Sequence, residues 1–486
     1  MTDYQVIIVG SGFGGQAAAI ELIKQQQNDF LILERRDFMG GTWVQNSYPG
    51  AAVDVQSPLY SLSAVPYDWS QMYAHRDELQ AYTDYIIEHF RLRQKTRLNS
   101  TVTAMRWNAE HCHWQLEING CEQLTARFVI NASGPLSTPV IPEFPGRDSF
   151  QGASFHTNNW DHNVSLEGKR VAIIGSGASA AQVIPAIVDS VTELHIFQRS
   201  PHWVVKRRDY VFKPWQRRIL RTKWGYRLLR NSIYLALELR VLGFKYSKLL
   251  LQLLAGNEAR RLIKQQISDP VLRQKVTPDF TIGCKRVIIS NTLYPAYCRE
   301  HVQVHDCHDG IAAITPSGIV TQSGQQVELD IIVYSTGFDA TDGMISYPVI
   351  GEHGRLLADF WQDYPRAYLG TTVPYFPNLF IVTGPNTGIG HTSALVVIEA
   401  QLQYIMRAMA AVSSAAKRAI VVKPEAEQRY TDHIHAEMRK TVWHWGGCNS
   451  WYKSKSGKVI AIFPGFSLTF KRWTRNFKAA NHYFID

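Results

Sequence analysis

Short apolar runs recur along the chain, and several of them end in glycine or other small residues. Ile7-Ile8-Val9 leads into a glycine-rich hexapeptide, and so does the run from Val171 to Ile174. An alanine-rich stretch follows each hexapeptide. This order is typical of a buried strand that turns into a helix. We therefore expect one strand-turn-helix-strand unit over residues 4–34 and a second unit that begins near Lys169.

Both glycine-rich segments fit the fingerprint G-x-G-x-x-G/A of a dinucleotide-binding unit. Their small residues allow backbone N–H groups to approach a pyrophosphate at the N-terminus of a helix. An ordinary tight turn would also favour glycine, but each copy here has a strand before it, a helix after it and a charged residue at a matching distance. The fingerprint positions are Gly10, Gly12 and Gly15 in the first copy, and Gly175, Gly177 and Ala180 in the second.

The charged residue that closes each unit distinguishes two nucleotides. Glu34 stands 24 residues after Gly10, and Arg199 stands 24 residues after Gly175. An acidic residue at this place accepts hydrogen bonds from a free ribose diol, whereas a basic residue can pair with a 2′-phosphate. The sequence therefore predicts one FAD site and one NADPH site.

Two further apolar runs border the second unit. Phe128 to Ile130 and Ile331 to Val333 each lead into a stretch of small residues. This arrangement suggests that the chain crosses twice between two domains. We predict an α/β fold with two Rossmann-like domains: a discontinuous FAD-binding domain formed by residues 1–134 and 338–486, and an inserted NADPH-binding domain formed by residues 135–337.

The remaining patterns give a coarser picture. Residues 205–280 alternate long apolar and basic side chains with few strand signals, and we expect a helical insertion there. Tyr375 to Val382 resembles a late strand, with residues 384–390 as its glycine-rich turn and a helix from about Thr392. The positive end of that helix would lie near the turn.

The charge is unevenly distributed. The 486 residues carry a net charge of +10, yet the segment from Arg199 to Arg286 holds 21 Lys and Arg against five Asp and Glu. Such a segment could attract a polyanionic cofactor, make peripheral contact with an anionic membrane surface, or simply form solvated helix faces. Nucleic-acid binding has no supporting motif. The chain enters its first strand without a signal peptide, so we expect a cytoplasmic protein.

The six cysteines include no C-x-x-C pair, which argues against a redox-dithiol flavoprotein such as a disulfide reductase. His111-Cys112-His113 has the composition of a metal cluster. We interpret it instead as alternating positions along a strand, and we expect no metal site.

Two long patterns together resemble the type I Baeyer–Villiger monooxygenases. The first, F-x-G-x-x-x-H-x-x-x-W-D, is matched by Phe150, Gly152, His156, Trp160 and Asp161. Related flavin-containing monooxygenases usually have Tyr or Phe in place of Trp160. The second pattern, [AG]-G-x-W-x4-[FY]-P-[GM]-x3-D, is matched by Gly40, Gly41, Trp43, Tyr48, Pro49, Gly50 and Asp54.

The resemblance implies roles for individual residues. Arg286 would be the catalytic arginine that reaches the flavin, and Asp54 would pair with it and position it. Lys285 would contact the cofactor phosphate, and Arg199 with Ser200 would bind the 2′-phosphate of NADPH. The cofactor-binding residues would also include Trp43 of the second pattern and Asn386 of the turn 384–390.

The first pattern has an implied structural role. His156 and Trp160 stand four residues apart, and on a helical turn they would share a face. The resemblance implies that the segment from Phe150 to Asp161 acts as a hinge. His156 would couple this hinge to bound nicotinamide nucleotide rather than transfer protons.

The implied reaction consumes NADPH and O2 and inserts one oxygen atom beside a ketone carbonyl through a C4a-peroxyflavin, giving an ester or lactone. Sulfides would be a second class of substrate. The residues leave three alternatives open: a sulfur- or nitrogen-oxidising flavin-containing monooxygenase, an NADPH oxidase or reductase without an organic substrate, and a non-catalytic flavin protein that docks to membranes through residues 205–280.

Overall fold

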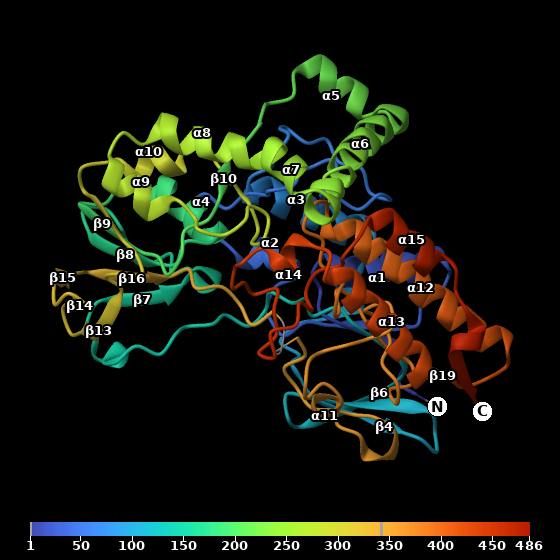
Figure 1. The fold of residues 1–486 in the computed structure, drawn as a ribbon. Helices are drawn as coiled ribbons and strands as arrows, with labels where there is room; N and C mark the ends of the chain where they lie inside the picture. The colour runs from blue at the N-terminus through green and yellow to red at the C-terminus, as the bar shows by residue number, and fades with distance from the viewer. Residues whose placement is uncertain (1, 341–343) are drawn as a thin grey trace.

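The computed structural model describes residues 2–340 and 344–486, and helices flank the two largest of its β-sheets (Figure 1). The larger sheet has the strand order β17-β4-β5-β6-β1-β2-β3, and β18 also pairs with β6. Its strands are β1 (Tyr4–Val9), β2 (Phe30–Leu33), β3 (Thr96–Arg97), β4 (Val102–Asn108), β5 (His113–Ile118), β6 (Glu122–Asn131), β17 (Val349–Ile350) and β18 (Leu379–Ile381).

The first predicted unit forms the centre of this sheet. β1 pairs in parallel with both β2 and β6, and α1 (Phe13–Lys24) begins four residues after β1 ends. One face of β1, with Val6 and Ile8, packs in the same core cluster as α1. The other face, with Ile7 and Val9, packs with side chains of β4 and β5. Both faces are therefore buried, as a continuous apolar strand requires. Three more helices come from the segments of the chain that also carry strands of this sheet: α2 (Thr42–Gln45), α3 (Arg76–His89) and α11 (Leu357–Phe360).

The second sheet is parallel throughout, with the order β12-β9-β8-β16-β7. Its strands are β7 (Ala153–His156), β8 (Arg170–Ile174), β9 (Glu193–Phe197), β12 (Val302–His305) and β16 (Ile331–Tyr334). On the left of Figure 1, helices α4 (Ala178–Ile187) and α10 (Leu293–Tyr297) lie above this sheet, and a small antiparallel sheet lies beside it. The antiparallel strands are β13 (Ile311–Thr315), β14 (Gly318–Thr321) and β15 (Gln326–Glu328).

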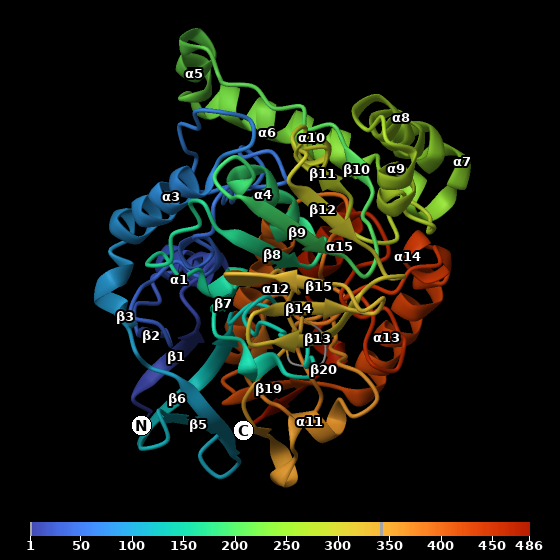
Figure 2. The same cartoon turned by 90° about the vertical axis from the view of Figure 1, so that its left-hand side faces the viewer.

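Helices fill most of the segment between the short paired strands β10 (Val204–Val205) and β11 (Ile288–Ile289). They are α5 (Pro214–Leu220), α6 (Lys223–Glu238), α7 (Lys248–Leu251), α8 (Asn257–Gln266) and α9 (Pro270–Val276). Two π-helical turns, Leu242–Tyr246 and Gln252–Gly256, flank α7. In Figure 2 α5 and α6 project from the top of the molecule.

The C-terminal part packs helices against the first sheet. They are α12 (Ala394–Ser414), α13 (Pro424–Met438), α14 (Val442–Trp445) and α15 (Ser467–Arg475), beside the antiparallel strand pair β19 (Ala419–Val422) and β20 (His482–Ile485). α12 is long and apolar enough to cross a membrane, but 72% of its apolar window is buried. It contacts α1 and α15 and therefore serves as a core helix. Single 3₁₀ turns lie at Leu92–Lys95, Arg147–Ser149, Thr157–Asn159, Glu352–Gly354 and Ala479–Asn481.

Two features of the cysteines differ from the expectation or add to it. The predicted strand through His111 is wrong, because β5 begins only at His113 and Cys112 has a φ of 51°, which belongs to a left-handed turn. The second feature is a disulfide between Cys284 and Cys448, 164 residues apart in sequence. The sequence offered no local spacing from which this bond could be inferred.

Candidate active site

The first glycine turn is closely packed. A Cβ atom on Gly10, which has a φ of +101°, would lie 2.7 Å from the carbonyl oxygen of Ala132, and one on Gly15 would lie 1.9 Å from that of Gly10. Gly12 is the N-cap of α1 and provides no side-chain cap. The first turn of α1 therefore presents backbone N–H groups without a side chain in front of them, which suits a phosphate.

Glu34 closes this unit directly after β2. Its carboxylate accepts hydrogen bonds from the backbone N–H of Ser11 at 3.0 Å and from the Ser11 hydroxyl at 2.6 Å. Only 7% of Glu34 is exposed. The carboxylate is thus held beside the glycine turn, where a ribose diol bound at that turn would meet it.

The second glycine turn follows the same construction. A Cβ atom on Gly175 would lie 2.2 Å from the carbonyl oxygen of Ser335, whereas Gly177 faces open space and Ala180 is buried in the core. Gly177 is the N-cap of α4, again without a side-chain cap. The Ser176 hydroxyl donates to the carbonyl of Ser200 at 2.7 Å and ties the turn to the segment after β9.

A cluster of basic and hydroxyl groups stands at that segment. Lys285 Nζ donates to Ser200 Oγ at 2.5 Å. Burial lowers the pKa of Lys285, and the nearby positive charge of Arg199 lowers it further. Arg199 is itself exposed. Two cations held close together next to a hydroxyl form an arrangement that favours an anion such as a phosphate.

Asp54 and Arg286 form a bidentate ion pair. Arg286 Nε donates to Asp54 Oδ2 and a terminal nitrogen of Arg286 donates to Asp54 Oδ1, both at 2.5 Å. The Asp54 charge holds the pKa of Arg286 above its ordinary value, so the guanidinium stays charged at any working pH. The side chain of Arg286 is 45% exposed and that of Asp54 24%. The pair therefore has one occupied edge and leaves the rest of the guanidinium accessible.

Tyrosines near this pair were missed by sequence reasoning. Tyr60 accepts a hydrogen bond from Trp43 Nε1 at 3.1 Å, and their rings meet edge to face. Burial raises the pKa of Tyr60 and raises that of Tyr452 to about 12, and the charges of Asp54 and Arg286 also act on both. Both phenols are therefore protonated at neutral pH. No local motif marks them, because they come from segments almost 400 residues apart.

The first long pattern forms β7 and the turn that follows it. A Cβ atom on Gly152 would lie 2.3 Å from the carbonyl oxygen of Asp330 and 2.5 Å from the ring of Phe150, so only glycine fits there. His156 is buried, and its Nδ1 accepts from the backbone N–H of Asn158 at 3.0 Å. Burial lowers the pKa of His156 to about 4, so its imidazole is neutral at physiological pH.

The expected shared face of His156 and Trp160 is not formed. The turn between them is a 3₁₀ turn of three residues, Thr157–Asn159, and it is too short for the i, i+4 relation of an α-helix. His156 packs edge to face on Phe338 at 5.6 Å between ring centres, while Trp160 packs on Phe155 at 5.0 Å. The two side chains therefore have separate partners.

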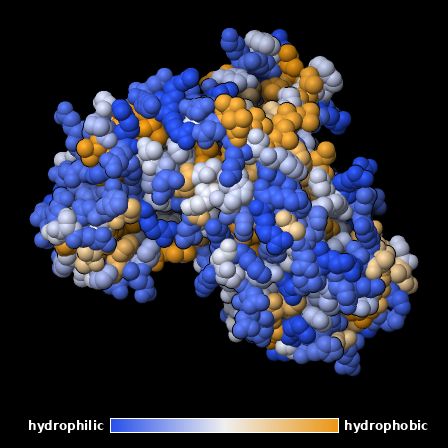
Figure 3. All heavy atoms as spheres, in the orientation of Figure 1, coloured by the Kyte–Doolittle hydropathy of each residue, from blue (hydrophilic) through white to orange (hydrophobic). Residues whose placement is uncertain are grey.

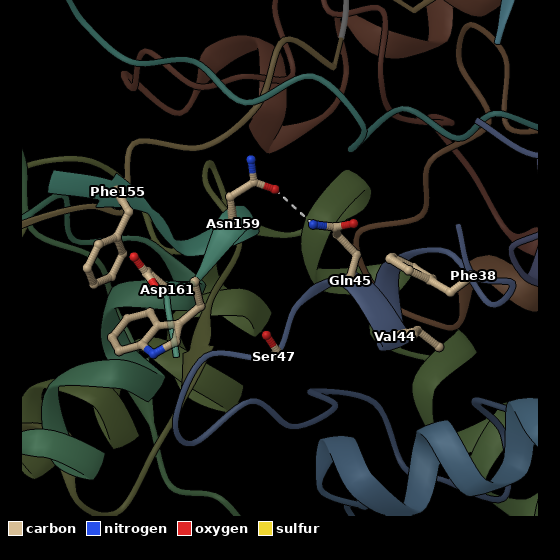
Figure 4. Close-up of a pocket in the computed structure, with 8 residues that line it drawn as sticks. Phe38, Val44, Gln45, Ser47, Phe155, Asn159 and Asp161 are labelled. Carbon is tan, nitrogen blue, oxygen red and sulfur yellow. Dashed lines mark hydrogen bonds between the residues drawn. The ribbon is translucent and has the colours of Figure 1, made fainter. Parts of the chain in front are cut away.

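A cleft of about 520 Å³ lies between this turn and the segment around α2 (Figure 4). Gln45 Nε2 crosses it and donates to Asn159 Oδ1 at 2.9 Å, as the dashed line in Figure 4 marks. Trp160 and Asp161 contribute to its other wall. Asp54 and Arg286 do not line this cleft, so it is distinct from the ion pair.

The turn 384–390 gives Asn386 a structural role. Asn386 Nδ2 donates to the carbonyls of Val459 and Ile462, at 3.1 and 3.0 Å, so its amide nitrogen is already committed to the chain. Directly after the turn, His391 Nδ1 and Thr392 Oγ1 are buried without a hydrogen-bond partner among the described residues. The polar edge of a bound heterocycle, such as that of a flavin, would provide hydrogen-bond partners for these buried atoms at the start of α12.

Comparison with known proteins identifies the family. Residues 7–236 match the family model described as pyridine nucleotide-disulphide oxidoreductase. The chain is 41% identical over 483 residues to a Baeyer–Villiger monooxygenase of Pseudomonas aeruginosa, covering 99% of this chain and 91% of that relative. A Baeyer–Villiger monooxygenase of Streptomyces coelicolor is 39% identical, with 98% and 92% covered.

A solved structure extends the likeness to the whole fold. The crystal structure of OTEMO in complex with FAD and NADP has a TM-score of 0.91 and 25% identity, with 100% of both chains covered. The predicted α/β fold with two dinucleotide-binding units is confirmed, and it defines a two-nucleotide oxidoreductase of the monooxygenase class. Within that class, the chain belongs to the Baeyer–Villiger monooxygenases.

Proposed function

We propose that the protein is an FAD- and NADPH-dependent monooxygenase that inserts one atom of O2 next to a ketone carbonyl and yields an ester or lactone. The observation that carries the proposal is the bidentate ion pair of Arg286 and Asp54. FAD, when bound and reduced by NADPH, supplies the activation of O2 and the transfer of the oxygen atom.

The residues that would hold FAD are those of the first unit. The N–H groups at the start of α1, exposed by Gly10, Gly12 and Gly15, would bind its pyrophosphate, and Glu34 would accept hydrogen bonds from its ribose. The unsatisfied atoms of His391 and Thr392 would meet the flavin ring. The chemistry of this set, with free backbone N–H donors and a buried carboxylate, suits a dinucleotide with a free ribose diol.

The residues that would hold NADPH are those of the second unit. The start of α4 at Gly177 would bind the pyrophosphate, and Arg199, Ser200 and Lys285 would bind the 2′-phosphate. Burial and the charge of Arg199 lower the pKa of Lys285, and a phosphate placed among these residues would compensate the charges of both cations. NADH lacks this phosphate and would gain nothing from the cluster.

Arg286 is the proposed catalytic residue. When a ketone carbonyl is attacked, negative charge develops on its oxygen, and a charged donor that is already in place stabilises that charge. Asp54 fixes the orientation of the guanidinium and leaves its outer edge free for this oxygen. Asp54 is therefore a positioning residue, because it acts through Arg286. The hydroxyls of Tyr60 and Tyr452, protonated at neutral pH, would add neutral donors nearby.

Product analysis tests the proposed reaction. The purified flavoprotein would be incubated with NADPH, air and an equimolar mixture of cyclohexanone and methyl phenyl sulfide, and the products would be separated by gas chromatography. We expect lactone as a major product, with sulfoxide beside it. Sulfoxide without lactone would identify a heteroatom-oxidising enzyme. Consumption of NADPH with hydrogen peroxide as the only product would identify an oxidase.

The partners are a ketone or sulfide and O2, together with peripheral membrane contact through residues 205–280, where basic and apolar side chains are exposed together. The proposed location is the cytoplasm, which supplies NADPH. The disulfide of Cys284 is compatible with this location because both of its cysteines are buried, which limits access by thiol reductants.

A further inference from the structure

An apolar stripe lies exposed on the outer side of the helical insertion. We define it by six residues that are each 56–72% exposed: Trp215, Trp224, Leu228, Leu235, Leu239 and Leu249. Four of them, from Trp224 to Leu239, follow the spacing i, i+4, i+11 and i+15 along α6 and its C-cap, so they lie on one side of that helix. Hydrophobic atoms gather over α5, α6 and α7 in Figure 3.

The folding of the chain does not account for this stripe, because α6 buries its other side. On that buried side a terminal nitrogen of Arg230 donates at 2.8 Å to the carbonyls of Pro58 and Ser61. Glu238 accepts from the Ser467 hydroxyl at 2.8 Å. Helix α6 therefore packs one side against the body of the protein and carries a second apolar side, which faces outward and which no described residue covers.

The segment that carries the stripe is strongly basic, and only part of its charge is paired, as in the ion pairs of Arg217 and Arg221 with Asp68. From Val211 to Gly256 the chain has ten Lys and Arg and a single acidic residue, Glu238, which is buried. Arg218, Lys223 and Arg227 are exposed beside the stripe, and no ion pair involves them within the described residues. The outer surface of this segment thus combines exposed tryptophans, leucines and unpaired cations.

This combination favours a membrane surface over a second copy of the chain as the partner that covers the stripe. Tryptophan with flanking Lys and Arg is the composition of segments that lie at a membrane–water interface, and an anionic lipid surface attracts each such cation. A second copy of this chain, docked by two-fold symmetry, would bring the same unpaired cations against each other. That repulsion opposes a dimer through this surface, whereas anionic headgroups neutralise it.

We propose that the stripe on α5–α7 docks the protein peripherally on an anionic membrane surface, with Trp215 and Trp224 in the headgroup region and the neighbouring cations on the lipid phosphates. This proposal specifies the surface and the lipid charge for the membrane contact of the proposed function, and it does not depend on ketone oxidation. Docking would hold α6 at the bilayer. Because Arg230 bonds α6 to the carbonyls of Pro58 and Ser61, the loop that follows Asp54 would lie beneath the docked helix.

Vesicle flotation tests the proposal on the full-length flavoprotein. Vesicles of phosphatidylcholine alone and vesicles containing about 30% phosphatidylglycerol would be compared at low salt and at 0.5 M NaCl. We expect flotation only with anionic vesicles, and less of it at high salt. The double variant Trp224→Gln, Leu228→Gln and the double variant Lys223→Gln, Arg227→Gln should each bind about tenfold more weakly or worse. Val271→Gln, an exposed apolar position outside the stripe, is the matched control and should bind as the wild type does.

The variants are checked before they are interpreted. Each should retain its flavin absorbance and its reduction by NADPH, since none of the changed residues lies in the nucleotide units or beside Arg286. Light scattering after size-exclusion chromatography measures whether the protein is a monomer or a dimer. The proposal is overturned if the wild-type protein does not float with anionic vesicles, or if the Trp224→Gln, Leu228→Gln variant floats with them to the same extent as the wild type. A dimer that this variant converts to monomer, without vesicle binding by the wild type, would assign the stripe to self-association instead.

Discussion

Arg286 and Asp54 are joined by two hydrogen bonds of 2.5 Å although they lie 232 residues apart. Asp54 belongs to the segment after the first glycine unit, and Arg286 stands just before β11, at the end of the helical segment. The pair therefore connects the parts of the chain that carry the two proposed nucleotide sites. It also fixes a charged guanidinium in one orientation, which a lysine at the same position could not reproduce.

Replacing Arg286 should separate two steps of the reaction. Arg286→Ala is expected to keep measurable flavin reduction by NADPH, because hydride transfer needs only that the nicotinamide lie over the flavin. Lactone formation should fall by about 10²–10³ or more, since one fixed donor to a developing oxyanion is lost, and hydrogen peroxide should accumulate. Stopped-flow absorbance measures the first step and product analysis the second. Unchanged lactone formation would remove Arg286 from the proposed mechanism.

Replacing Arg199 should change the choice of nicotinamide cofactor. Arg199→Ala removes a charge-assisted contact to the 2′-phosphate, worth about 1.5–3 kcal/mol, which corresponds to roughly tenfold to a hundredfold in KM for NADPH. The KM for NADH should stay nearly constant, because NADH has no phosphate there. Steady-state kinetics with both cofactors measure the difference. Arg218→Ala, which removes an exposed arginine of α5, is the control. Equal rises for NADPH and NADH would exclude Arg199 as the discriminating residue.

The parts of the fold that the sequence predicted are those that depend on neighbouring residues. Gly10 and Gly175 are needed because a Cβ atom would collide with backbone at each turn, and this requirement shows in the sequence as a motif. The strands before these turns are recognised as continuous apolar runs because both of their faces are buried. Arg286 and Asp54 were named through family patterns, since their spacing carries no local signal.

Features that depend on distant segments could not be predicted. Strand β17 has only two residues and joins the first sheet from beyond residue 348. The late strand expected within residues 375–382 is present as β18, but its pairing with β6 could not be inferred from the sequence. Tyr60 and Tyr452 approach the same ion pair from opposite ends of the chain. The bond between Cys284 and Cys448 forms only because α14 ends beside the segment that carries Lys285. Tertiary packing determines these contacts, and no short pattern encodes it.

Mild acid should destabilise the protein through buried histidines. Burial lowers the pKa of His156, His202 and His482 to about 4 each, whereas an unfolded histidine titrates near 6.5. Between these pH values the unfolded chain binds more protons, so the free energy of unfolding falls as pH decreases from about 6.5 to 4. The upper limit is about 3 kcal/mol for each histidine. Urea unfolding at pH 7.5, 6 and 5 measures the loss, and a constant free energy over this range would contradict it.

The disulfide should stabilise the segment that carries Arg286. Cys284 is fully buried, two residues before Arg286, and a Cβ atom on Gly446 would lie 2.7 Å from its Cβ, so the two segments are packed closely. Cys448→Ser is expected to lower the free energy of unfolding by about 2–4 kcal/mol, because the unfolded chain regains the freedom of a long loop. Thermal unfolding with and without a strong reductant measures this effect. Reductant should lower the Tm of the wild type and of Cys298→Ser, an exposed free thiol, by the same amount. It should leave Cys448→Ser unchanged, and a reductant response in that variant would assign the effect to another thiol.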